Sequence, residues 1–268
     1  MIVLDGIPAE QLGMHVLKDY VDPSITATRD SGVVIPGRHG EIDFGAYLER
    51  KEFNFPIVLI PQSSYQEALD KTDELKNILL DNYGRPRTFE LLINDRPDRY
   101  YNVRYSGSLP INDLLKNRFF TLPLVAHEPF PFSVLKSDEN LTWGSKIPFA
   151  TRIAFGHKPS TFTVTGSQNL QVNNIGSLVV RPIVEISGTA TALTLTINGE
   201  SFSFGNLNNE TLFIDAATYT VMKNGINHLF NTVGNLEKLE LFPGKNTARI
   251  GGTNLNINVN FKFQGKYR

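Results

Sequence analysis

The stretch SSYQEALDKTDELKNILLD, residues 63–81, decides the class of fold, because it is the one segment with clear helical signals. Ser64 and Glu67 have the spacing of a capping box, in which a serine oxygen accepts from the first turn and a glutamate reaches back. Apolar residues recur at three- and four-residue steps, which predicts one buried stripe. Its members are Tyr65, Ala68, Leu69, Leu75, Ile78 and Leu79.

The end of this helix is predicted from Gly84 and Pro86. Glycine tolerates the left-handed turn that closes a helix, and proline cannot continue the hydrogen-bond ladder. The helix is therefore expected over residues 63–81.

The rest of the chain is rich in short strand patterns. Alternation of apolar and polar residues, together with β-branched and aromatic content, predicts strands. Asn198-Gly199 is a strong hairpin signal between two of them. The expected strands are 33–35, 53–60, 88–93, 100–105 and 118–125 in the first half, and 161–165, 193–197, 201–204 and 255–261 in the second.

A domain boundary is predicted at the segment EPFPF, residues 128–132, because two prolines stiffen the chain. Residues 1–135 carry 14 basic and 19 acidic side chains, net −5, and residues 136–268 carry 12 and 8, net +4. The fold class is thus mainly β. Residues 1–135 are expected to form a mostly antiparallel sheet system with the one α-helix laid against one face, and residues 136–268 a C-terminal galectin-like or jelly-roll β-sandwich.

Composition narrows the classes of function. The chain has 268 residues, a formal net charge of −1 and no cysteine, so no global field attracts nucleic acid and no thiol chemistry is available. The N-terminal residues lack the pattern of a signal peptide, and no apolar run is long enough to span a bilayer.

Catalytic motifs are not evident in the sequence. The five histidines show no metal-ligand spacing, and no nucleophile elbow or phosphate-binding glycine loop occurs. Asp70, Asp73 and Glu74 cluster on the helix, but Lys71 and Lys76 lie beside them, which favours solvated surface charge over acid–base catalysis. We expect no enzyme activity and no cofactor.

Two short segments are candidates for contacts with a neighbouring subunit. Arg38 and His39 lie between glycines in the loop Pro36–Gly40, which predicts an exposed loop with unusual backbone angles. Arg96, Arg99 and Tyr100 lie in a charged hairpin tip whose two aspartates balance its two arginines.

Trp143 is the only tryptophan and lies near the domain boundary. A tryptophan can stack on a sugar in an open groove, but this position favours a core or interface role.

Several longer segments resemble the phage distal tail protein family, the hub of long non-contractile tails that infect Gram-positive bacteria. They lie in the same order along almost the whole chain, although each is weak by itself. They are PGRHG at 36–40, the lone helix, EPFPF at 128–132, NNIGS at 173–177, RPIVEISG at 181–188, TLFIDAATYTVMKNGIN at 211–227 and LELFPGKNTARI at 239–250.

The resemblance implies a two-domain structural protein of the virion tail tip. Its N-terminal domain, residues 1–135, would be a ring-forming β-sandwich with one α-helix, and its C-terminal domain, residues 136–268, would be galectin-like. Six copies would close into a ring whose central channel continues the tail tube and passes DNA. The implied partners are the tail tube protein, the tail-associated lysin or baseplate hub, and receptor-binding proteins. The chain has no long insertion of the kind that carries a carbohydrate-binding module in larger relatives.

The acidic helix face suggests a role in such a ring. If Asp70, Asp73 and Glu74 face the channel, they would let DNA slide, because a basic lining would bind phosphates. Two other classes of function stay open: a carbohydrate-binding, lectin-like module that contacts the host surface, and an enzyme whose site the sequence does not display.

Overall fold

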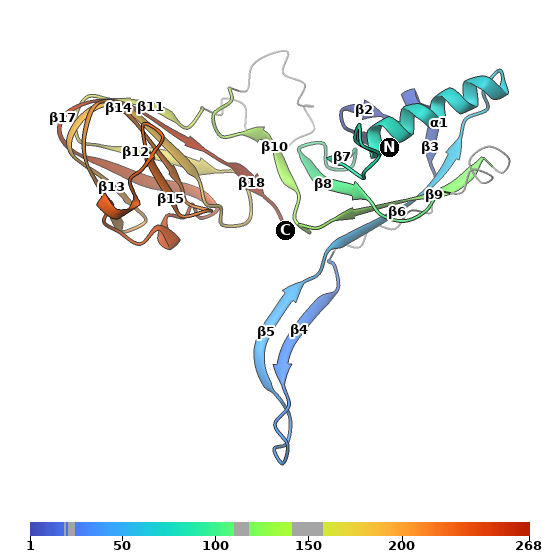
Figure 1. Ribbon diagram of the computed structural model, residues 1–268, viewed down its shortest axis with the longest axis horizontal. Helices are drawn as coiled ribbons and strands as arrows, with labels where there is room; N and C mark the ends of the chain where they lie inside the picture. Colours follow the sequence, from blue (N-terminus) through green and yellow to red (C-terminus); the bar gives the residue numbers. More distant parts are fainter. Residues whose placement is uncertain (19, 21–24, 110–117, 141–157) are drawn as a thin grey trace. The chain divides into compact units, whose positions relative to one another are not determined.

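The computed structural model describes residues 1–18, 20, 25–109, 118–140 and 158–268, and Trp143 lies outside these ranges. The chain divides into two compact units, Met1–Pro131 (unit 1) and Phe132–Arg268 (unit 2). Within the described ranges the secondary structure is almost entirely β, with α1 (Tyr65–Leu79) as the single α-helix (Figure 1). The predicted fold class, mainly β with one helix, is confirmed. The assignment of ring formation to residues 1–135 and of a galectin-like fold to residues 136–268 remains a prediction.

Unit 1 is built on an antiparallel sheet with the strand order β2-β1-β7-β8-β9-β6-β3. The predicted hairpin at 88–105 is confirmed, because β7 and β8 pair with Leu92 opposite Tyr100. The bounds are β1 Ile2–Leu4, β2 Ile7–Pro8, the 3-10 helix η1 Ala9–Leu12, β3 Met14–Val16, β6 Lys51–Leu59, β7 Thr88–Ile93, β8 Arg99–Tyr105 and β9 Phe119–Ala126. A separate two-stranded sheet is formed by β4 Thr28–Val33 and β5 Ile42–Leu48.

The start of α1 follows the predicted capping pattern. The Ser64 side chain accepts a hydrogen bond from the Glu67 N–H at 3.1 Å. The Glu67 carboxylate accepts from the N–H of Ser63 at 2.9 Å, one residue before the usual return position. The cap therefore satisfies one exposed donor of the first helical turn, the Glu67 N–H, and the Ser63 N–H just before the helix.

The helix ends earlier than the predicted residue 81. Leu80 is extended, with φ −118° and ψ 151°, and it forms an isolated β-bridge with Pro86. Gly84 adopts the left-handed conformation, with φ 73°, but it does so in the turn after the helix. The glycine and proline therefore mark the return of the chain to the sheet and not the helix end.

The buried stripe of α1 differs from the predicted one in two ways: one predicted member is exposed, and one residue that was not predicted is buried. Leu75, Ile78 and Leu79 are buried as expected, but Tyr65 is 67% exposed, so its assignment to the stripe was wrong. Thr72 takes a buried position instead, because its hydroxyl donates to the Ala68 carbonyl at 2.9 Å and so needs no water.

Alternate side chains of β6 enter the core of unit 1. Phe53, Phe55 and Ile57 are fully buried in one cluster with the buried leucines of α1. Lys51 also points inward and is only 4% exposed. Its ammonium lies 4.9 Å from the ring centroid of Tyr101 and 3.2 Å from the Tyr101 hydroxyl, which offsets the cost of burying the charge.

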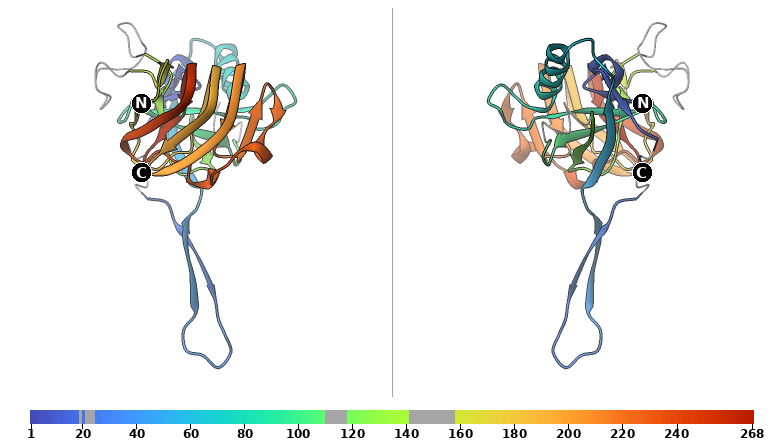
Figure 2. Two further views of the ribbon diagram at one scale, coloured as in Figure 1. Left: turned by 90° about the vertical axis from the view of Figure 1, so that its left-hand side faces the viewer. Right: turned by 90° about the vertical axis from the view of Figure 1, so that its right-hand side faces the viewer.

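Unit 2 contains three long antiparallel strands that lie side by side and curl, as Figure 2 shows. They are β13 Ile183–Ile197, β14 Glu200–Asp215 and β17 Gly244–Lys262. The others are β10 Phe132–Lys136, β11 Thr161–Val164, β12 Gln168–Asn174, β15 Thr220–Lys223, β16 Ile226–Asn227 and β18 Gln264–Lys266, with 3-10 turns η3 Leu229–Asn231 and η4 Leu236–Lys238.

The curl arises where the long strands bulge at the same level. Register shifts interrupt the pairing of β13 with β14 and of β13 with β17. Ala192, Asn209 and Asn254 have φ between 52° and 55° there, a conformation that side chains rarely adopt outside turns and bulges.

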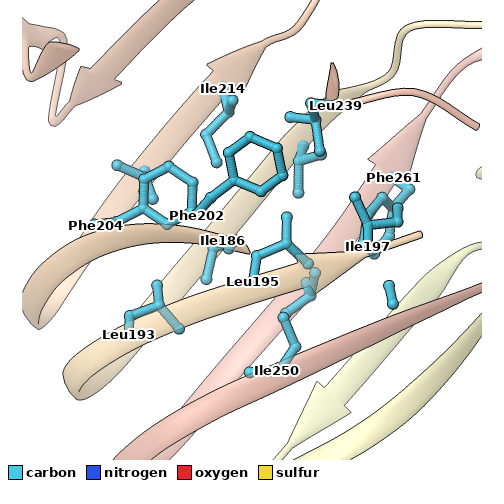
Figure 3. Packing of buried hydrophobic residues seen from close by; sticks show 14 of the residues in the cluster. Ile186, Leu193, Leu195, Ile197, Phe202, Phe204, Ile214, Leu239, Ile250 and Phe261 are labelled. Atoms are coloured by element: carbon cyan, nitrogen blue, oxygen red, sulfur yellow. The ribbon is translucent and has the colours of Figure 1, made fainter. Parts of the chain in front are cut away.

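The core of unit 2 lies on the concave side of these strands. Leu195, Phe202, Phe204 and Ile250 are at most 1% exposed and pack together, as Figure 3 shows. The β13–β14 hairpin turns at Asn198-Gly199 with φ 49° and 89°, so this predicted turn is confirmed.

The asparagines that alternate along β17 lie on its outer face, where Asn256 and Asn258 are exposed to solvent. They do not protect a free sheet edge, because β17 pairs on both sides, with β13 and with β11 and β12. Asn258 and Asn260 accept hydrogen bonds from the hydroxyls of Thr163 and Thr161 at 2.9 and 3.1 Å. The asparagines therefore tie adjacent strands together on the outer face.

The buried Asn246 accounts for the tight turn formed by the segment FPGKN, residues 242–246. It is 2% exposed and makes four hydrogen bonds: its oxygen accepts from the N–H of Phe242 and the amide of Asn198, and its amide donates to the carbonyls of Phe242 and Gly244. A buried amide with every partner present fixes the turn before β17.

Replacing Leu75→Ala should lower the free energy of unfolding by about 2–5 kcal/mol, because it leaves a cavity under α1. Tyr65→Ala is the matched control and should change it by less than about 0.5 kcal/mol. Urea unfolding followed by circular dichroism measures both, and equal losses would refute the observed stripe.

Asn246→Ala should lower the free energy of unfolding by about 1–3 kcal/mol, because partners of its amide lose their hydrogen bonds. The exposed Asn169 on β12 supplies the control Asn169→Ala, which should be nearly neutral. Thermal unfolding of the two variants side by side is the measurement. A neutral Asn246→Ala variant would show that the turn does not need the buried amide.

Candidate interaction surfaces

Residues 25–50 form a hairpin, here called the arm, whose two strands pair only with each other. Pairing runs from Thr28 opposite Leu48 to Val33 opposite Ile42. Apolar side chains of the arm are unusually exposed: Ile25 73%, Val33 50%, Val34 70%, Ile35 41%, Phe44 60%, Tyr47 63% and Leu48 36%. An isolated two-stranded hairpin is marginally stable in water, and contiguous exposed apolar surface marks interaction sites.

The tip of the arm is the predicted loop Pro36–Gly40. Arg38 and His39 are exposed, and Gly37 and Gly40 have φ 82° and 77°. The expectation of an exposed loop with left-handed glycines is confirmed. The contact of Arg38 and His39 with another subunit remains a prediction.

The base of the arm borders an open cleft of about 740 Å³. Its walls combine Ile25 and Leu48 with the charged side chains of Arg29, Glu49, Arg50 and Glu52, and with His127. Arg50 pairs with Glu52 at 2.9 Å, but both side chains are more than half exposed, so this ion pair contributes little to stability. The cleft therefore has apolar and charged groups available to a partner.

The charged hairpin tip at 95–99 is less exposed than its sequence indicates. Arg96 is exposed, whereas Tyr100 is 8% exposed, and the Arg99 side chain is 10% exposed beside Asp98 at 3.6 Å. Arg99 and Tyr100 are largely buried because β8 begins at Arg99 and takes both residues into the sheet, and their contact with a neighbouring subunit remains a prediction. Arg96 keeps the exposure that a surface contact requires.

Asp70, Asp73 and Glu74 all lie on the exposed face of α1. Lys71 binds Glu74 and Lys76 binds Asp73, each at 2.8 Å. Asp70 accepts from the amide of Gln66 at 3.1 Å. The face is therefore a solvated and partly neutralised surface, and its position against a channel remains a prediction.

Three of the segments behind the family resemblance meet in unit 2. Arg181 donates to the Tyr219 hydroxyl at 2.6 Å and to the Glu240 carboxylate at 3.1 and 3.2 Å. The Glu240 bond is the largest cause that raises the pKa of the Arg181 guanidinium, so the arginine stays charged. These motifs thus hold a local structure together, and nothing in their separate patterns indicates that they meet.

Sequence reasoning missed an apolar patch at one end of the unit 2 sheet. Phe230 is 95% exposed, Ile226 74% and Val233 70%, all in the segment INHLFNTV at 226–233. The available signal was the cluster of apolar residues in this segment, interspersed with Asn, His and Thr, directly after the Asn224-Gly225 turn.

In the described ranges, no group of three or more His, Asp or Glu side chains is placed to hold a metal ion. No described helix has both the length and the apolar character needed to cross a bilayer.

Comparison with known structures gives a match over the whole chain. The crystal structure of SPP1 Dit, described as a paradigm of the hub adsorption apparatus in phages that infect Gram-positive bacteria, has a TM-score of 0.65 and 15% identity. The match covers 100% of this chain and 98% of that one, and at this identity it shows the fold alone.

Weaker matches include the baseplate of phage P2 in its activated conformation with Ca, with a TM-score of 0.40 and 9% identity over 93% of this chain and 90% of that one. A score this low carries no argument. No curated protein matches the sequence.

Among protein families, the phage tail protein RIFT-related domain matches residues 7–126, which hold the arm, the helix and every strand of the unit 1 sheet except β1. The expected resemblance of the chain to phage distal tail proteins is confirmed by the domain match over residues 7–126 and by the fold that the chain shares with SPP1 Dit.

Proposed function

We propose that this chain is a structural hub protein of a phage tail tip that assembles with copies of itself through the arm. The observation that carries the proposal is the exposed apolar surface of the arm, which no other part of unit 1 covers among the described residues. The phage tail domain at residues 7–126 and the Dit-like fold support the same role.

The proposed assembly is a ring of six copies. A head-to-tail contact, in which the arm of one copy lies on a different surface of the next, closes into a ring when the rotation between copies permits. The arm suits such a contact because its exposed Val34 and Phe44 lie outside the lining of the cleft at its base, so the apolar side chains and the mixed apolar and charged cleft can serve as two different contact surfaces.

The proposed partners follow from a hub position in the virion. One face of the ring would join the tail tube protein, and the other would carry the tail-associated lysin or baseplate hub and receptor-binding proteins. DNA would pass through the central channel. In this proposal the role is architectural and not enzymatic.

Assembly through the arm can be tested by light scattering over a concentration series. Six copies of the 30.0 kDa chain give about 180 kDa. The double variant Val34→Asp with Phe44→Asp should shift the mass to that of a single chain, because it places charge in the apolar contact.

Two controls complete this experiment. Phe230→Asp changes an exposed phenylalanine outside the arm and should leave the assembly intact. Both arm positions are at least 60% exposed, so the double variant should keep the circular dichroism and melting temperature of the wild type. A wild-type chain that stays at 30 kDa at every concentration would contradict self-assembly.

Arg96→Glu tests whether the hairpin tip at 95–99 joins subunits. If it does, charge reversal should raise the concentration needed for assembly, and the effect should weaken in high salt. Arg99 is unsuitable for this test, because its side chain lies in the sheet. Normal assembly of Arg96→Glu would exclude the tip from the interface.

Replacing Asp70, Asp73 and Glu74 with lysine tests the proposed channel face. DNA ejection from virions that carry the triple variant should slow or stall, because a basic lining binds phosphate. Replacement with asparagine and glutamine is the matched control, since it removes charge without adding a cation. Unchanged ejection of the lysine variant would place this face outside the channel.

A further inference from the structure

A polar groove of about 290 Å³ lies on the outer face of unit 2, across β13, β14 and β17. Every residue that lines it is polar or glycine. They are Ser187, Gly188, Thr189, Asn209, Glu210, Thr211, Asn256 and Asn258. Its lining shares no residue with the arm or with the apolar patch at 226–233.

The strand register places hydroxyl and amide groups in a row across the sheet. Ser187 pairs with Thr211 on one side and Asn258 on the other, and Asn258 pairs with Thr163 on β11. Directly opposite residues on paired strands point to the same face. Neighbouring strands lie about 4.8 Å apart, close to the length of one pyranose ring, so adjacent polar groups can reach adjacent sugar units.

The groove is hollow because of the bulges described above. Gly188 has φ 129°, and a Cβ atom there would lie 2.2 Å from the Asn256 carbonyl oxygen, so only glycine fits. Asn209, with φ 55°, turns back so that its N–H bonds to the Thr189 hydroxyl at 3.1 Å. The backbone therefore recesses the centre of the polar row.

Hydrogen-bonding capacity remains at the groove. Asn258 uses its oxygen to accept from Thr163, which leaves its amide hydrogens to donate. The Thr189 hydroxyl accepts from Asn209 and can still donate. Alternating donors and acceptors of this kind match vicinal sugar hydroxyls, each of which can both donate and accept.

The charge of the groove favours an uncharged ligand. Glu210 pairs with Lys223 at 3.1 Å, and its carboxylate also accepts from the Asn208 N–H at 3.1 Å. The Asn208 bond and then Lys223 lower the pKa of the Glu210 carboxyl, which stays ionised beside its lysine. One carboxylate neutralised by one ammonium gives no net attraction for phosphate or sulfate.

We propose that this groove binds a neutral oligosaccharide that lies across β14, β13 and β17, with Ser187, Asn256 and Asn258 as its central hydrogen-bonding residues. No aromatic side chain lines the groove to stack on a sugar, so one site should bind with a dissociation constant in the millimolar range, about −4 kcal/mol. If the proposed ring forms, several sites on one particle would raise the avidity.

Saturation-transfer difference NMR tests the site, because it observes the sugar protons and works for one chain or a ring. The probes are cellotriose, maltotriose and chitotriose, with glycerol 3-phosphate as the charged comparator. We expect a signal from at least one trisaccharide. The double variant Asn256→Ala with Asn258→Ala should reduce it at least about fivefold, whereas Asn169→Ala, an exposed asparagine on β12, should leave it unchanged.

The outcomes separate the site from the hub proposal. No trisaccharide signal, an equal signal from the double variant, or a signal only from glycerol 3-phosphate would each overturn the groove assignment. None of these results depends on ring assembly, and light scattering of the double variant should match that of the wild type. Circular dichroism of the same sample checks that the double variant is folded.

Discussion

A β-hairpin can satisfy its backbone hydrogen bonds internally while it leaves its side chains without cover, and the arm of this protein has that property. Its ladder from Thr28 to Leu48 is complete apart from one bulge, yet Val34, Phe44 and Tyr47 are at least 60% exposed. Apolar surface of this extent is costly to keep in water. The interpretation of the molecule as a building block depends on this constraint more than on any single side chain.

The arm is connected directly to the buried core of unit 1. β5 leads within two residues into β6, whose Phe53, Phe55 and Ile57 are fully buried beneath α1. The helix contributes through packing and capping, and its charged face is left to solvent.

The main feature of unit 2 is the bend of its three long strands, β13, β14 and β17. Bulges at one level of β13, β14 and β17 bend all three, which wraps the concave side around the core and recesses the convex side at Gly188. The same backbone feature therefore produces both the core shown in Figure 3 and the polar groove. The positive φ values of Ala192, Asn209 and Asn254 are the local cost of the bend.

The sequence by itself determined the features that depend on neighbouring residues. The cap at Ser64, the Asn198-Gly199 turn, the glycines of the arm tip and the strand alternation were all predictable, because each follows from local backbone and hydrogen-bonding preferences. The order of the motifs also indicated the phage tail family.

Only the tertiary structure decided which side chains meet and which are covered. In the folded chain Tyr100 is buried and Tyr65 is exposed. Arg181 bonds to Tyr219 and Glu240, and the alternating asparagines of β17 lie on an interior strand of the sheet. These outcomes depend on strand order and on contacts between residues far apart in the chain. A periodic pattern tells which residues share a face, but it does not tell what that face packs against.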